Sequence, residues 1–198
     1  MIKIQKKLRI SYRECIAILK QGGVIAYPTE TSYGLGCDPR HTKAIQKIYK
    51  IKKREKNKPC ILIASSMSGV KKVADISKLS VQAKKTFQKL AKKYWPGALT
   101  MVLPGILTKT VAIRITSSSI AQQLTKKFGY PLISTSANIS GSTECRSAIS
   151  CKKVFKQKYK PDFIFDGGTL KKSKPSTLIR ILPNGGIEVL RQGAIEIQ

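Results

Sequence analysis

Short apolar runs alternate along the chain with longer segments in which apolar residues recur every three or four positions. The short runs are rich in Val, Ile and Leu and have the length of buried strands. The longer segments have the spacing of one helix face, as from Ala44 through Ile48 to Lys52. This alternation predicts an α/β layer fold with a mixed sheet. The predicted strands cover residues 24–28, 60–64, 99–103, 111–115, 132–134, 163–165, 176–182 and 187–191, and the predicted helices cover 11–20, 42–52, 80–95, 120–128 and 147–156.

Local signals set the ends of several of these elements. Ser11 followed by Glu14 predicts a capping box at the start of the first helix, which Gly22-Gly23 ends. Thr42 is expected to cap the second helix with its hydroxyl. The last two strands are predicted to form a hairpin, because Pro183-Asn-Gly-Gly186 lies between them.

Length and composition predict one domain over residues 1–198, since no repeat or linker divides the chain. The five cysteines are scattered, odd in number and without a C-x-x-C pair, and His41 is the only histidine, so we expect neither a disulfide framework nor a protein metal site. No run approaches the roughly 20 apolar residues that cross a bilayer, and no secretory signal opens the chain. We therefore expect a cytoplasmic protein without a membrane segment.

The charge is strongly positive, with 38 Lys and Arg against 10 Asp and Glu and a formal net charge of +28. Such a chain attracts polyanions, and its basic surface is suited to nucleotide phosphates, tRNA or other RNA. The alternative is a solvated basic face without a specific partner, because many lysines lie in predicted helices.

Polar segments border the predicted strands at four places. Ligands of open α/β sheets bind at strand ends, so these segments form the candidate site. Each also has a local explanation, because Ser, Asn and Gly favour turns and lysines complement the carboxyl end of a helix. The segments are 27–36, 52–59, 134–141, and 176–177 together with 191–193.

Arg114 stands inside the apolar run Val111-Ala-Ile-Arg-Ile115. A buried guanidinium there needs an anionic partner or a polar cavity. The alternative is an outward-facing side chain on a half-exposed strand. The chain contains no G-x-x-x-x-G-K-[ST] phosphate loop, no G-x-G-x-x-G and no G-x-S-x-G elbow, which argues against the enzyme classes that use them.

Taken in order, the polar segments resemble the YrdC/TsaC-type threonylcarbamoyl-AMP synthase family over about residues 10–194. The resemblance is specific because seven motifs occur in the family's order. They are Pro28-Thr-Glu-Thr-Ser-Tyr-Gly-Leu-Gly36, Lys52-x-Arg54 followed by Lys58-Pro59, Trp95-Pro-Gly97 before Leu99-Thr100, Val111-Ala-Ile-Arg114, Ser134-Thr-Ser-Ala-Asn-Ile-Ser-Gly141, Ser176-Thr177 and Arg191-Gln-Gly193.

The resemblance implies a YrdC-like twisted mixed sheet with flanking helices and a concave basic cavity. It implies synthesis of threonylcarbamoyl-AMP from L-threonine, bicarbonate and ATP, the first step of tRNA threonylcarbamoyladenosine modification, with downstream threonylcarbamoyl-transferase proteins as partners. By motif, threonine is assigned to Thr31, Arg114, Ser134 and Ser176. ATP is assigned to Lys52, Arg54, Lys58, Ser136, Asn138 and Arg191, with Lys52 and Arg54 as the catalytic pair.

The chain departs from the family pattern at two positions. Glu55 stands where proline is usual, and Ser32 where an apolar residue is common. Because the chain stops soon after Gly193, we also expect no further C-terminal domain of the kind that two-domain relatives carry. Mg²⁺ is expected to be carried by the ATP phosphates, and the segment from Lys52 to Lys58 is the candidate for closing the site.

Two other functions compete with this interpretation. The first is an RNA-binding module whose charge is its function, although the aromatic residues are not gathered into a stacking platform. The second is another carbamoyl transfer on the same fold, such as the carbamoyl-phosphate chemistry of hydrogenase maturation, which normally needs further domains.

Overall fold

The computed structural model describes residues 12–55, 58–156 and 158–197. The first described helix spans residues 12–20, as predicted, but Ser11 and hence its capping box lie outside the described residues. The predicted closing segment is also only partly described, since residues 56–57 fall outside.

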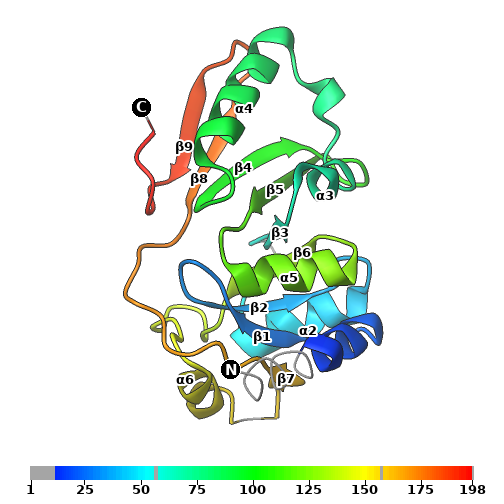
Figure 1. The fold of residues 1–198 in the computed structure, drawn as a ribbon, viewed down its shortest axis with the longest axis vertical. Coiled ribbons are helices and arrows are strands. Elements are labelled where there is room, and N and C mark those ends of the chain that lie inside the picture. The colour runs from blue at the N-terminus through cyan, green and yellow to red at the C-terminus, as the bar shows by residue number, and fades with distance from the viewer. Residues whose placement is uncertain (1–11, 56–57, 157, 198) are drawn as a thin grey trace, which may run out of the picture.

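Nine strands form one mixed sheet in the order β7-β1-β2-β6-β3-β5-β4-β8-β9 (Figure 1). Parallel pairs join β3 to β5, β4 to β8 and β1 to β7, and the other neighbours are antiparallel. The alternating apolar runs therefore form the expected twisted α/β fold. The strands are β1 Ile25–Pro28, β2 Tyr33–Cys37, β3 Ile61–Ala64, β4 Leu99–Pro104, β5 Thr110–Ile115, β6 Leu132–Ser136, β7 Phe163–Ile164, β8 Thr177–Ile181 and β9 Ile187–Arg191.

Helices cover both sides of this sheet. Besides the predicted helices, a short helix and a 3₁₀ turn follow β3, where the apolar spacing was too brief to predict them. The predicted hairpin is confirmed by the antiparallel pairing of β8 with β9. The helices are α2 Thr42–Lys52, α3 Met67–Lys71, η1 Ile76–Lys78, α4 Val81–Tyr94, α5 Ser119–Phe128 and α6 Ala148–Val154.

The twist gives the molecule an elongated shape with β3 near its middle (Figure 1). At one end, α4 lies beside β4, β8 and β9, and at the other end α2, α5 and α6 surround β1 and β2. One core cluster contains Leu35, Ile48 and Phe87, and a second, smaller cluster joins Ile63 and Leu124 on the α5 side.

Two local predictions were wrong. The N-cap of α2 is His41, without a side-chain hydrogen bond, and Thr42 is the first helical residue. Ser80, by contrast, caps α4 by accepting a hydrogen bond from the Ala83 amide. The second half of the segment 27–36 is a strand and not a loop, because β2 pairs with both β1 and β6.

The glycines of β2 interrupt the apolar pattern by which a strand is recognised in the sequence. At Gly36, packing requires a glycine. A Cβ on Gly36 would lie 2.6 Å from Cε1 of Tyr27 and 2.8 Å from the carbonyl oxygen of Ile133. At Gly36 the strand therefore passes so close to its neighbours that no side chain fits there.

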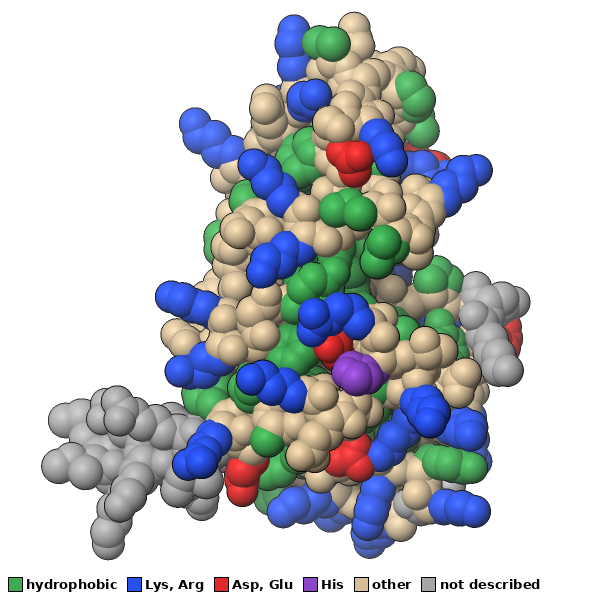
Figure 2. Space-filling view, turned by 90° about the vertical axis from the view of Figure 1, so that its right-hand side faces the viewer, with side chains coloured by type: hydrophobic (Ala, Val, Ile, Leu, Met, Phe, Trp, Pro, Cys, Tyr) green, Lys and Arg blue, Asp and Glu red, His purple; other side chains and the backbone are tan. Residues whose placement is uncertain are grey.

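Lys and Arg side chains are spread over the face shown in Figure 2, with few Asp and Glu among them. They do not gather into one continuous patch on this face. No described helix is long and apolar enough to cross a membrane.

Candidate active site

A cavity of about 200 Å³ opens near the middle of the sheet, where four chain segments meet. The turn after β1, the end of the loop before β3, the last residues of β6 and the segment entering β8 all contribute to its wall. These are the four polar segments that the sequence places at strand ends. Arg114 of β5 completes the wall.

The four residues assigned to threonine all line this cavity. The register explains part of this convergence: Ile63 pairs with Arg114, and Ile61 pairs with Ser134, so the two polar side chains lie on the same side of the sheet. Thr31 lies within a turn in which the Thr29 hydroxyl donates to the Ser32 carbonyl oxygen at 2.7 Å. The hydroxyls and the guanidinium thus face one space.

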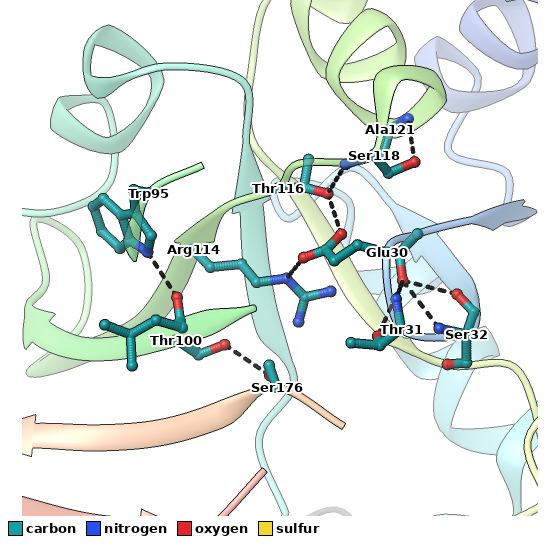
Figure 3. A network of polar contacts seen from close by, with 12 residues as sticks. Glu30, Thr31, Ser32, Trp95, Thr100, Arg114, Thr116, Ser118, Ala121 and Ser176 are labelled. Atoms are coloured by element: carbon teal, nitrogen blue, oxygen red, sulfur yellow. Dashed lines mark hydrogen bonds and ion pairs between the residues drawn. The ribbon is translucent and has the colours of Figure 1, made fainter. Parts of the chain in front are cut away.

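Arg114 is buried, so the alternative of an outward-facing side chain is wrong. Its Nε lies 2.9 Å from Oε1 of Glu30, and the two side chains are 5% and 13% exposed. The second oxygen of Glu30 accepts a hydrogen bond from the Thr116 hydroxyl. Figure 3 shows Glu30 reaching from the turn after β1 toward Arg114 and Thr116.

Ser176 lies at the centre of a second polar cluster. Its hydroxyl lies 2.9 Å from Oγ1 of Thr100, a contact drawn in Figure 3. Arg191 donates to both the hydroxyl and the carbonyl oxygen of Ser176. Gly193 is needed for this approach, because a Cβ there would lie 2.3 Å from the carbonyl oxygen of Pro175. This close approach of Gly193 to Pro175 and Ser176 keeps the Arg191 guanidinium at the cavity wall.

The residues assigned to ATP divide into two groups. Arg54, Ser136 and Arg191 line the cavity. Arg54 donates to the carbonyl oxygens of Lys58 and Pro59, which holds its guanidinium against the loop before β3. Lys58 lies outside the cavity wall and forms an exposed ion pair with Glu55 at 3.1 Å. Glu55, which stands where the family usually has proline, therefore pairs with the lysine that the motif assigns to the ATP phosphates.

Lys52 and Asn138 lie behind the wall instead of in it. Lys52 is 1% exposed, and its Nζ donates to the Ser136 and Asn138 carbonyl oxygens and to Asn138 Oδ1. The Asn138 amide nitrogen donates in turn to the Ser142 carbonyl oxygen. These two residues hold the shape of the segment after β6 and do not face the cavity.

The cavity is electropositive, with three arginines against one carboxylate, Glu144, among its lining residues. Burial, together with the charge of Arg114, lowers the pKa of Arg191. An anion bound between these guanidiniums would relieve that unfavourable arrangement. Among the described residues, no group of three or more His, Cys, Asp or Glu could hold a metal ion.

Sequence reasoning missed the residues that support this wall. Glu30 lies inside a quoted motif without an assigned role, although a guanidinium in an apolar strand signals that such a partner exists. Thr100 also stands in one of the motifs without an assigned role, and its partner Ser176 is 76 positions away. Glu144 gave no local signal, because its neighbours in the cavity wall come from distant parts of the chain.

The family model Sua5_yciO_yrdC, described as telomere recombination, matches residues 17–193. The threonylcarbamoyl-AMP synthase of Psychromonas ingrahamii is 39% identical over 174 residues, which cover 83% of this chain and 89% of the relative.

Solved structures of similar proteins have the same fold. The P. abyssi Sua5 structure complexed with L-threonine superposes with a TM-score of 0.81 at 31% identity and covers 92% of this chain, which spans 54% of that longer one. The E. coli YciO structure gives a TM-score of 0.77 at 27% identity, with 96% of this chain and 91% of that chain covered.

Proposed function

The chain belongs to the Sua5/YciO/YrdC family, and from that premise we propose that it is a threonylcarbamoyl-AMP synthase. The reaction joins L-threonine, bicarbonate and ATP to give L-threonylcarbamoyladenylate and pyrophosphate. One observation carries the proposal: three guanidiniums and the hydroxyls of Thr31, Ser134 and Ser176 line a single cavity. Such a site suits a substrate with a carboxylate at one end and phosphates at the other.

The reaction needs positioning and charge neutralisation more than a protein nucleophile. The threonine amine and bicarbonate give a carbamate with loss of water. A carbamate oxygen then attacks the α-phosphorus of ATP, and the bond from that phosphorus to the bridging oxygen breaks as pyrophosphate leaves. In this assignment Arg114 binds the threonine carboxylate, and Arg54 and Arg191 neutralise the phosphates.

Lys52 and Asn138 have a different role in this proposal from the one that the motif gives them. Their polar atoms are occupied by the segment after β6, so they position Ser136 for the nucleotide without touching it themselves. Arg54 remains the residue of the catalytic pair that faces the cavity.

The residues of the cavity wall are compatible with Mg²⁺ that enters bound to ATP. Mg²⁺ usually keeps several waters and is held by substrate phosphates with one or two carboxylates. Glu144 is the carboxylate among the lining residues that could face such an ion. When bound, the ion would neutralise phosphate charge.

We further propose that the chain acts as one domain in the cytoplasm, where ATP and tRNA occur together. Its single described sheet supports one unit. The spread of basic side chains in Figure 2 is compatible with a weak, salt-sensitive attraction to tRNA. Downstream threonylcarbamoyl-transferase proteins would take up the labile product.

The test is pyrophosphate release from ATP with and without threonine and bicarbonate, with the adenylate product identified by mass. Release that requires both substrates, with threonylcarbamoyl-AMP formed, supports the proposal. Release independent of threonine would contradict it. A salt-sensitive RNA complex without any turnover of ATP would favour the RNA-binding alternative.

A further inference from the structure

Arg114 presents two edges of its guanidinium to different surroundings. The Nε edge faces Glu30, with Nε and Oε1 2.9 Å apart. Neither of these two buried atoms forms a hydrogen bond among the described residues, the contact between them included, so the attraction between them is that of an ion pair. In Figure 3 the terminal nitrogens of Arg114 lie on the side of Thr31 and Ser176, with no contact drawn to them.

Glu30 is itself held in place. The Thr116 hydroxyl donates to its second oxygen, and the Ser118 amide donates to the Thr116 hydroxyl at 3.2 Å. Ser118 is also the N-cap of α5, where its hydroxyl accepts a hydrogen bond from Ala121. The carboxylate is therefore tied to the start of a helix, and this chain of contacts fixes its position relative to β5.

The charges explain why this arrangement matters. Burying a guanidinium that is only 5% exposed costs free energy unless an anion lies nearby. Glu30 supplies that anion at the Nε edge. The remaining edge, with two terminal N–H groups, matches a carboxylate in a two-bonded geometry. Glu30 does not line the cavity, so it does not compete for the ligand.

We propose that Glu30 is a positioning residue that holds the Nε edge of Arg114 and aims its terminal nitrogens at the α-carboxylate of the amino-acid substrate. This inference rests on the proposed function and adds to it a residue to which the motifs assign no role. It makes recognition of a free α-carboxylate depend on a residue that never touches it.

The experiment compares binding of L-threonine and of L-threonine amide, which lacks the carboxylate charge, to the full chain by calorimetry. In Glu30→Gln, the dissociation constant for L-threonine should rise about tenfold or more, because a charged contact is weakened. The preference for threonine over its amide should shrink, whereas the KM for ATP should stay the same. A general loss of packing would not produce that selective change.

Two further variants sharpen the test. Thr116→Val removes one hydrogen bond to Glu30 and should raise the threonine dissociation constant about two- to fivefold. This variant tests the role of Glu30 if Glu30→Gln does not fold. Adding Glu30→Gln to Arg114→Gln should have no additional effect, because Glu30 acts through Arg114. The matched control is Glu188→Gln, which breaks an exposed Arg–Glu pair of the same 2.9 Å length outside the cavity.

The outcomes separate this inference from the proposed function. If the unaltered chain binds no threonine and makes no adenylate, the proposed function fails. If the unaltered chain binds threonine and Glu30→Gln binds it equally well, only the role of Glu30 is overturned. Multiplicative effects of the Glu30 and Arg114 substitutions would likewise overturn it.

Discussion

The ammonium of Lys52 lies 2.7 Å from Oδ1 of Asn138, inside the protein and behind the cavity wall. It also donates to the carbonyl oxygens of Ser136 and Asn138. The end of α2 is thereby fastened to the segment after β6. The lysine of the Lys-x-Arg motif thus supports the cavity wall from behind, while Arg54 lines the cavity.

We predict that ATP use declines as the pH rises through about 8. Burial, helped by the charge of Arg54, lowers the pKa of Lys52 to about 8. Below that pH the ammonium offers three donors to its three acceptors, and above it the neutral amine offers two. One acceptor then loses its donor, and the segment that carries Ser136 loosens. The kcat/KM for ATP, measured from about pH 7 to about pH 9.5, checks this, and a flat or rising profile would contradict it.

Arg54→Ala should lower kcat/KM for ATP by roughly 10- to 100-fold, because a charged contact to phosphate is lost. The side chain lies at the surface of the loop before β3, so the melting temperature should change little. Lys89→Ala on the exposed face of α4 removes the same charge far from the cavity and is the control. Unchanged turnover in Arg54→Ala would remove this residue from the nucleotide site.

Ser136→Ala should weaken ATP use less than Arg54→Ala does. Its hydroxyl donates to Asn138 Oδ1 at 2.8 Å, and a neutral hydrogen bond contributes about 0.5–1.5 kcal/mol. The KM for ATP should therefore rise by no more than about tenfold. Steady-state kinetics of both variants in one buffer checks the order, and a larger effect in Ser136→Ala would show that Ser136 makes a charged contact.

Glu55→Gln should strengthen ATP binding slightly, because it frees Lys58 from an exposed ion pair. Such pairs contribute about 0.2–1 kcal/mol and are screened by salt, so the KM for ATP should fall by at most about fivefold at low ionic strength. In a Lys58→Ala background the same substitution should have no effect. A gain that persists without Lys58 would mean that Glu55 acts directly on the nucleotide.

The strands and long helices could be predicted because their signals are local. Val24 to Pro28 and the runs of β3, β4 and β5 are apolar over the length of a strand, and Ser80 caps α4 through an amide three residues away. Thr42, like Ser80, has a hydroxyl suited to capping a helix, but it forms no cap. The N-cap of α2 is His41, so Thr42 is already the first helical residue. The strand β2 was missed because packing against Tyr27 requires glycine where the pattern needs apolar residues.

The sequence by itself determined the fold class, the family and the residue types of the site, since these depend on apolar spacing and on motifs that are continuous in the chain. The tertiary structure decided which of those residues line the cavity. Arg114 forms an ion pair with Glu30, 84 positions earlier in the chain. The buried Lys52 donates a hydrogen bond to Asn138, 86 positions later. Partners this distant are set by sheet register and by the burial of charge, which no local pattern encodes.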